Sequence, residues 1–134
     1  MPVVERFQFQ HLANPAGSIV VAHGERDVPF AIRRIYFLYG VPADQMRGRH
    51  AHKTLTQIAV CVRGSCRFCL DDGHERTELV LSKPYEGLVI RPMMWREMSD
   101  FSEDCVLLVL ASDAYDESDY IRDYEEFKNA VRAR

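Results

Sequence analysis

The chain has 134 residues, of which 47% are hydrophobic and 28% are charged. This length predicts a single domain over residues 1–134 and leaves no room for a second one. The formal net charge of −3 argues against binding to nucleic acid or to an anionic membrane surface. The sequence has no apolar run of membrane-spanning length and no signal-peptide pattern over residues 1–6, so we expect a cytoplasmic protein.

Apolar residues alternate with polar ones over many short segments, which is the pattern of half-buried β-strands. In chain order, strands are expected at residues 3–9, 18–22, 32–39, 56–63, 66–70, 77–81, 88–90 and 106–110. Gly64-Ser65 and Asp72-Gly73 predict tight turns within this series. Short strands with frequent turns predict an all-β fold, a sandwich or a small barrel with one open mouth for a ligand.

The end of the chain has the clearest helical pattern in the sequence. Apolar and aromatic residues recur there on one helical face: Tyr120, Ile121, Tyr124, Phe127 and Val131. Asp116 or Ser118 is expected to cap the start of this helix, and basic residues near its end suit the helix dipole. We interpret Arg122 and Lys128 as part of the solvent-facing side of the helix.

The segment Arg47-Gly48-Arg49-His50-Ala51-His52-Lys53 contains two of the five histidines of the chain. On a strand, the spacing of His50 and His52 points both imidazoles to one face. An imidazole titrates near neutral pH, so such a pair indicates either proton transfer or metal ligation. A first-row metal needs three or four protein ligands. Gln57 is a poor ligand, so we favour chemistry without a metal.

The remaining possible ligands do not complete a metal site in the sequence. His11, His23 and His74 are expected in turn-like or terminal positions. The four cysteines are Cys61, Cys66, Cys69 and Cys105. Cys66 and Cys69 have the spacing of half a zinc knuckle, but no second pair follows them, so we expect reduced thiols packed in the core.

Two motifs carry a resemblance to known proteins. His50-x-His52 followed by Gln57 and Gly64 resembles the first motif of the cupin superfamily, which has Glu where Gln57 stands. Glu97 lies near the position where cupins have a third histidine. The finer resemblance is to the WxcM-like nucleotide-sugar 3,4-ketoisomerases, and it is carried by Pro29-Phe30-x-Ile32-x-Arg34-x-Tyr36, Arg47-Gly48-x-His50-Ala51-His52-Lys53, Trp95-x-Glu97-Met98 and Tyr115-Asp116-Glu117-x-Asp119-Tyr120-Ile121-Arg122.

This resemblance implies an RmlC-like jelly-roll β-barrel of the cupin type with a C-terminal α-helix. It implies conversion of dTDP-4-keto-6-deoxy-D-glucose to a 3-keto sugar without a cofactor, as a step toward the amino sugars of lipopolysaccharides, S-layer glycans or natural products. A positioned imidazole suits the removal of the weakly acidic C3 proton and its return at C4. We expect His52 to carry this proton with His50 as its partner, although the order could be reversed, and Tyr36 and Arg47 to stabilise the enediolate.

Further residues are expected to bind the substrate, and arginine is a natural clamp for its diphosphate. These residues are Arg33, Arg34, Arg49, Lys53, Gln57, Trp95, Arg96 and Glu97. Because adjacent strand residues face opposite ways, one of Arg33 and Arg34 is expected to face solvent. On residue type alone, Tyr36 could equally be a core aromatic, and Trp95 more often packs than stacks on a base.

Two positions differ from common members of the family at the sugar end of the expected pocket. Ala16 stands where an arginine is frequent, and Arg96 where a histidine is frequent. These differences favour the gluco configuration of the product at C4. We also expect a homodimer in which the apolar N-terminal strand at residues 3–9 is exchanged, because a half-open barrel leaves strand edges to cover.

Two other functions are compatible with the same residues. One is a metal-dependent cupin enzyme of the dioxygenase type. The other is a non-catalytic module that binds nucleotide sugars. Metal content and the effect of replacing His50 and His52 would distinguish them from an isomerase.

Overall fold

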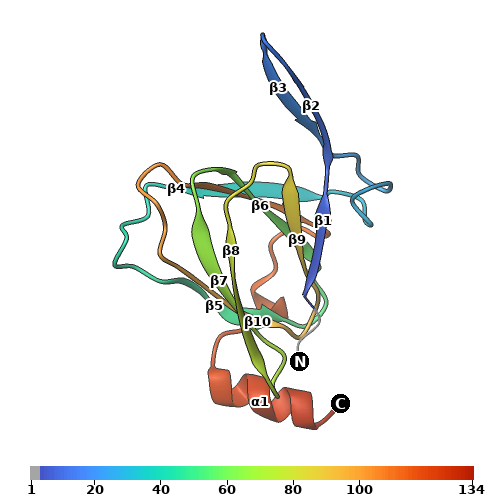
Figure 1. Cartoon of the computed structure of the whole chain (residues 1–134). Helices are drawn as coiled ribbons and strands as arrows, with labels where there is room; N and C mark the ends of the chain where they lie inside the picture. Colours follow the sequence, from blue (N-terminus) through green and yellow to red (C-terminus); the bar gives the residue numbers. More distant parts are fainter. Residues whose placement is uncertain (1–3) are drawn as a thin grey trace.

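The fold was analysed in a computed structural model that describes residues 4–134 (Figure 1). One five-stranded sheet consists, in spatial order, of β1 (Glu5–Gln8), β9 (Glu86–Ile90), β6 (Gln57–Arg63), β11 (Val106–Ala111) and β4 (Arg34–Tyr39). The second consists of β12 (Tyr120–Ile121), β5 (Arg47–His52), β10 (Trp95–Ser99), β7 (Cys66–Asp71) and β8 (Arg76–Leu81). A separate hairpin is formed by β2 (Gln10–Asn14) and β3 (Gly17–Val21). The chain ends in a 3₁₀ turn, η1 (Glu117–Asp119), and the helix α1 (Tyr124–Arg132).

The two large sheets share one apolar core. Alternation along β6 directs Ala59 and Cys61 into this core, where they meet Phe68 of β7 and Met98 of β10. Ile58 and Val60 face the other side of β6 and pack in a second cluster under the N-terminal strand. The fold is thus mostly β-sheet with one C-terminal helix, as the alternating pattern predicted. Among residues 4–134, no helix combines the length and the apolar character that crossing a membrane requires.

The N-terminal segment divides into two parts. β1 occupies an edge of the first sheet, where it pairs with β9 of the same chain. Residue 3, the first of the predicted strand 3–9, lies outside the described residues. The β2–β3 hairpin then projects from the body of the molecule (Figure 1) and leaves Ile19 61% exposed and Leu12 52% exposed. β3 confirms the strand predicted at 18–22, whereas β2 was not predicted, and it places His11 in a strand rather than a turn.

The predicted C-terminal helix was wrong over its first part. Tyr120 and Ile121 form the short strand β12, which pairs with β5, and α1 begins only at Tyr124. Asp123 caps α1 by accepting a hydrogen bond from the Glu126 backbone N–H. Asp116, one of the two expected caps, instead caps η1 through the Ser118 backbone N–H. The apolar residues there serve both elements, because Ile121 and Phe127 are buried in the same small cluster.

The β6–β7 turn requires glycine at position 64. Gly64 has a φ of +72°, and a Cβ atom there would lie 2.6 Å from the Asp104 carboxylate, 2.9 Å from the Cys105 Cα and closer still to the Ser102 hydroxyl oxygen. Gly40 has a similar φ of +68°, but a Cβ atom there would meet no heavy atom within 4 Å. Substituting alanine at both positions would therefore distinguish the cost of backbone strain, present at both, from the cost of a steric clash, present only at position 64.

We therefore predict that Gly64→Ala lowers the free energy of unfolding by more than Gly40→Ala does. Backbone strain alone should cost about 1 kcal/mol at Gly40. The added displacement of the loop at 102–105 should bring the cost at Gly64 to roughly 3 kcal/mol. Urea unfolding of both variants measures the difference, and equal losses would contradict the predicted clash.

Candidate active site

A cavity of about 360 Å³ opens between the two large sheets. Its lining comes from β4, β5, β10 and the segment that precedes α1: Arg34, Tyr36, Phe37, Leu38, Arg47, Gly48, His50, Met98, Tyr120 and Arg122. A narrow extension of about 10 Å³ continues from Tyr36 and His50 toward Gln57 and Arg96. The cavity thus combines cationic, phenolic and imidazole groups at one end of the core.

His50 and His52 lie on one face of β5, as their spacing predicted. Their ring centroids are 4.9 Å apart, with the rings nearly perpendicular at 87°. The Tyr120 ring contacts both, with centroids 4.9 Å from His50 and 4.3 Å from His52. His50 lines the cavity, whereas His52 is only 1% exposed and does not line it. His50 is therefore the imidazole that a ligand in the cavity would contact.

Asp119 fixes the second imidazole. Its Oδ2 atom lies 3.0 Å from Nδ1 of His52, and its Oδ1 atom accepts hydrogen bonds from the backbone N–H and the hydroxyl of Thr54 at 2.8 and 2.9 Å. Partial burial opposes ionisation, but the hydrogen bonds from Thr54 and His52 outweigh it and lower the pKa of Asp119. The carboxylate therefore accepts a hydrogen bond from Nδ1–H and leaves the Nε2 lone pair of His52 available.

Arg96 is a charged residue in the core, 2% exposed, next to the histidine pair. Its Nη1 donates to Oε1 of Gln57 at 2.5 Å, and its Nε and Nη2 both donate to the Met94 carbonyl oxygen. Nε2 of Gln57 in turn donates to the Tyr36 hydroxyl oxygen at 3.0 Å. Because this bond uses a lone pair of Tyr36, the phenolic proton remains free to donate toward the cavity.

Burial and the neighbouring guanidinium keep both imidazoles neutral. Desolvation and then the charge of Arg96 lower the pKa of His50 to about 3 and that of His52 to about 4. Burial also lowers the pKa of Arg96, but only to about 10, so the guanidinium stays charged at neutral pH. Burial raises the pKa of Tyr36, which keeps its hydroxyl protonated. Nδ1 of His50 and Nε2 of His52 are buried with no hydrogen-bond partner among the described residues.

The residues around the histidine pair do not fit a divalent metal ion. The amide oxygen of Gln57, which stands at the carboxylate position of the cupin motif, already accepts from Arg96. The buried guanidinium places a positive charge beside both imidazoles, where a second cation would be repelled. Within residues 4–134, the other three histidines lie elsewhere. His11 stacks on Tyr85, His23 lies 3.5 Å from the Asp27 carboxylate, and His74 is in the turn after β7, where its backbone N–H donates to Asp72.

Five residues expected to bind substrate do not line the cavity. Trp95 and Glu97 alternate with Arg96 along β10, so they face the C-terminal helix instead. Nε1 of Trp95 donates to Glu97, and the Trp95 ring packs on Phe127. Trp95 is thus a packing residue, as its residue type alone favoured. The other three residues have exposed positions outside the cavity lining: Arg33, Arg49 and Lys53.

Alternation and strand ends explain those three positions. Arg33 precedes β4 and faces the opposite way from Arg34, as expected for one of that pair. Arg49 interrupts β5 with a φ of +62°, and Lys53 follows the last residue of the strand. Of the predicted residues, Arg34, Tyr36, Arg47 and His50 line the cavity, while Gln57 and Arg96 lie behind it in the extension.

Three residues of the site were missed in the sequence. Tyr120 was assigned to a helix and Arg122 to its solvent-facing side, while Asp119 was named only within a family motif. In the structure Asp119 ends η1, where it reaches His52, and Tyr120 in β12 and Arg122 just after it line the cavity. The Arg122 guanidinium lies 4.1 Å from the centroid of the Tyr120 ring and bonds to Glu117. The i, i+2 spacing of Tyr120 and Arg122 is the signal that would have indicated a strand.

The sequence matches a family model described as FdtA: WxcM-like, C-terminal, over residues 3–132. A TDP-4-oxo-6-deoxy-alpha-D-glucose-3,4-oxoisomerase from Aneurinibacillus thermoaerophilus is 46% identical over 123 residues, which are 92% of this chain and 88% of that protein. The match therefore extends over nearly the whole of both chains.

Two solved structures have the same fold at high identity. One is a histidine-to-asparagine variant of the 3,4-ketoisomerase QdtA from Thermoanaerobacterium thermosaccharolyticum, in complex with TDP-4-keto-6-deoxyglucose. It has a TM-score of 0.97 and 40% identity, over 100% of this chain and 97% of that one. The other is a 3,4-ketoisomerase from Helicobacter canadensis, with a TM-score of 0.93 and 42% identity over 96% and 97% of the two chains.

We predict that lowering the pH below neutral reduces the free energy of unfolding, because the imidazoles of His50 and His52 are held neutral in the folded protein. In the unfolded chain His52 binds a proton below its ordinary pKa of about 6.5, whereas in the folded protein it stays neutral until about pH 4. The free energy of unfolding should therefore fall by about 2 kcal/mol for this residue between pH 7 and pH 5. Denaturant unfolding at both pH values tests this. In His52→Gln, the fall in the free energy of unfolding between pH 7 and pH 5 should be smaller by the same amount. An unchanged pH dependence in the variant would contradict it.

Proposed function

This chain belongs to the FdtA family of WxcM-like proteins, and from that membership we propose that it is a sugar 3,4-ketoisomerase. Its substrate would be dTDP-4-keto-6-deoxy-D-glucose, and residues 1–134 would act as one ketoisomerase domain. The observation that supports this most is a neutral imidazole, His50, that lines a cavity with a free phenolic proton beside it. The two large sheets would be the halves of a cupin jelly-roll, with the cavity at its mouth.

The reaction moves a ketone from C4 to C3 of the sugar. His50 takes the proton from C3, and the electron pair forms an enediolate with C4. C4 is then protonated on the opposite face of the ring, because the C3 and C4 hydrogens of a gluco sugar lie on opposite faces. The proton of the C3 hydroxyl passes to the oxygen on C4, so that C3 becomes the ketone and C4 carries the hydroxyl. The cavity position of His50 and the burial of His52 favour His50 as the base that takes the C3 proton, the reverse of our first choice.

The developing enediolate needs donors that are fixed before the reaction. Tyr36 has a free phenolic proton because Gln57 donates to its oxygen, and Arg96 holds Gln57 in that orientation. The guanidinium of Arg34 lies 4.6 Å from the centroid of the Tyr36 ring and brings a positive charge to the same wall. No step of this mechanism transfers an electron pair to or from an external group, so we propose that no cofactor takes part.

The diphosphate of the substrate would bind the arginines of the cavity wall. Arg34, Arg47 and Arg122 line the cavity from three different segments. Nη1 of Arg34 is buried without a hydrogen-bond partner among the described residues, so it is ready for an anionic ligand. A cytoplasmic location follows from this substrate class, since nucleotide sugars are made and modified in that compartment. The product would supply an aminotransferase in the synthesis of amino-sugar glycans.

We propose the gluco configuration for the product at C4. Arg96 occupies a position where members of the family often have a histidine. Here its guanidinium lies next to the imidazole pair, and its hydrogen bonds to Gln57 and Met94 fix it. The gluco configuration requires that C4 receives its proton on the face of the ring opposite His50, because the C3 and C4 hydrogens of a gluco sugar lie on opposite faces. A metal-dependent dioxygenase is not favoured, because the same guanidinium opposes a cation.

Turnover in deuterated water tests the mechanism. We predict that the wild-type protein incorporates deuterium at C4 of the product, and that His50→Asn slows turnover by roughly 10³-fold with TDP affinity within threefold of wild type. Arg33→Ala, which changes an exposed residue outside the cavity, should retain full turnover. Proton coupling constants of the same product report the C4 configuration.

Two results would contradict this function. A wild-type protein that binds TDP-4-keto-6-deoxyglucose without exchange would be a binding module. Full turnover in the His50→Asn variant would remove the assignment of His50 as the base. A galacto coupling pattern would contradict only the proposed configuration.

We propose that the protein is a homodimer in which the N-terminal hairpin, rather than β1, crosses to the partner. β1 already pairs with β9 of its own chain, whereas the β2–β3 hairpin projects with Leu12 and Ile19 exposed. Ala16 lies in the turn between β2 and β3 and is not among the residues that line the cavity. If position 16 borders the sugar, as the resemblance implies, it must do so in the partner's cavity.

A solvent-exposed apolar face is available to receive the hairpin. β4 is an edge strand of the first sheet, and it exposes Ile35, Phe37 and Tyr39 on its outer side, each by more than half. Exposed apolar side chains on an edge strand are unfavourable in an isolated chain. Association would cover both surfaces.

We therefore predict that light scattering gives the mass of a dimer for wild type. The double variant Leu12→Asp with Ile19→Asp should give the mass of a monomer and lose most of its turnover. Val80→Asp, which changes an exposed residue of β8, is the matched control and should stay dimeric. A monomeric wild type, or a dimeric double variant, would contradict the proposed role of the hairpin.

A further inference from the structure

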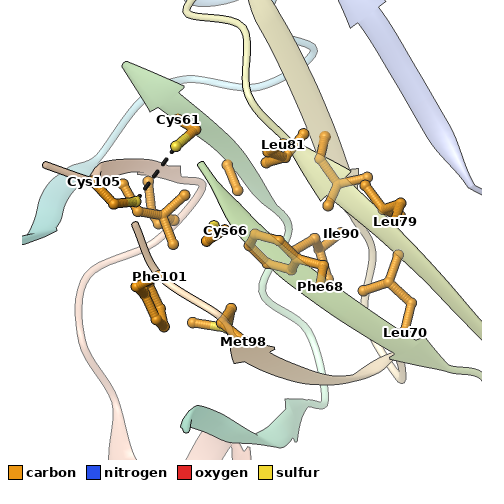
Figure 2. Close-up of a cluster of buried hydrophobic side chains, with 14 residues drawn as sticks. Cys61, Cys66, Phe68, Leu70, Leu79, Leu81, Ile90, Met98, Phe101 and Cys105 are labelled. Carbon is orange, nitrogen blue, oxygen red and sulfur yellow. Dashed lines mark hydrogen bonds between the residues drawn. The ribbon is translucent and has the colours of Figure 1, made fainter. Parts of the chain in front are cut away.

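Three cysteines from three separate segments meet in the core (Figure 2). Cys61 lies on β6, Cys66 begins β7, and Cys105 immediately precedes β11. Their sulfur atoms all lie within 4.8 Å of one another, and those of Cys61 and Cys105 are 3.5 Å apart. All three are free thiols, none more than 4% exposed. Cys61 lies four residues along β6 from Gln57, which places the cluster roughly 13 Å from the candidate active site.

The fourth cysteine is not part of this cluster. Residues 66 and 69 fall on opposite faces of β7, so Cys69 points away from Cys66 and toward Arg76, whose Nη1 lies 3.5 Å from its sulfur. The Cys66-x-x-Cys69 spacing therefore does not form half of a zinc knuckle. Cys69 is instead a matched control, because it is a buried cysteine of the same strand that lies outside the cluster.

The cluster provides three sulfur ligands in apolar surroundings. Phe68, Leu81, Phe101 and Leu107 pack around the cysteines within the same apolar core. Among residues 4–134, no histidine or carboxylate extends this group of possible ligands to four. A structural zinc ion prefers four ligands in a tetrahedron, so the site is one ligand short for zinc. Three soft sulfurs suit a thiophilic centre that is satisfied by three bonds.

Charge selects among the thiophilic centres. Copper(I) bound to three thiolates would bury two negative charges, mercury(II) would bury one, and arsenic(III) would bury none. An unpaired buried charge costs several kcal/mol, so an apolar site favours the neutral complex. Three sulfurs bonded at about 2.3 Å to a pyramidal centre lie roughly 3.5 Å apart, which is close to the spacing of Cys61 and Cys105.

We propose that Cys61, Cys66 and Cys105 form a binding site for one trivalent thiophilic metalloid, with arsenite as the ligand. One As(OH)₃ reacts with three thiols to give As(SR)₃ and three water molecules. Three As–O and three S–H bonds break, three As–S and three O–H bonds form, and no atom is oxidised or reduced. The product links β6, β7 and the loop before β11, so it would stabilise the fold without entering the candidate active site.

The spacing of the thiols also favours the reaction. A centre bonded to Cys61 already lies within reach of Cys105, whose sulfur atom is 3.5 Å from that of Cys61. The loop at 101–105 must open to admit the ligand, because all three sulfurs are buried.

Native mass spectrometry of the reduced full-length protein with one equivalent of sodium arsenite tests the site. We expect one arsenic per chain in wild type and in Cys69→Ser, and at least hundredfold weaker binding in Cys66→Ser and Cys105→Ser. X-ray absorption of the wild-type complex should show three sulfur neighbours. Because this measurement uses only the wild-type protein, it still tests the proposal if a variant fails to fold.

Three outcomes would overturn the proposal. They are no binding by wild type at one equivalent, two sulfur neighbours in place of three, and binding that is lost in Cys69→Ser but kept in Cys66→Ser.

Discussion

A buried guanidinium is the interaction on which the candidate active site depends. Arg96 donates to Gln57 and to the Met94 carbonyl oxygen, and its charge adds to the effect of burial in keeping the neighbouring imidazoles of His50 and His52 neutral. In a metal-binding cupin site, a cation surrounded by protein ligands would occupy this position. Here a side chain of the fold supplies the positive charge, so the imidazoles are left as bases rather than ligands.

The sheet arrangement explains how distant residues reach this point. β5 and β10 are antiparallel neighbours with His50 opposite Arg96, and β12 pairs with the other edge of β5. The first pairing places the guanidinium next to the histidines, and the second brings Asp119 within hydrogen-bond distance of His52. The candidate mechanism is therefore built on backbone pairing, which orients each group before a ligand binds.

The sequence predicted the strands and the histidine pair well, because alternation with a period of two determines both. It failed where tertiary context overrode a local pattern. Tyr120, Ile121 and Phe127 fit one helical face, yet an aspartate cap at Asp123 starts the helix late and leaves Tyr120 in a strand. Similarly, β10 was not predicted, because two charged residues, Arg96 and Glu97, lie in the middle of it. A fully buried arginine can be recognised only when its hydrogen-bond partners Gln57 and Met94 are known.

The proposed chemistry depends on the protonation state of the two imidazoles, and ¹⁵N NMR of histidine-labelled protein at pH 6 measures that state directly. We expect neutral rings for both, with His52 carrying its proton on Nδ1 toward Asp119 and none on Nε2. Imidazolium signals for either residue at that pH, or a proton on Nε2 of His52, would contradict this expectation.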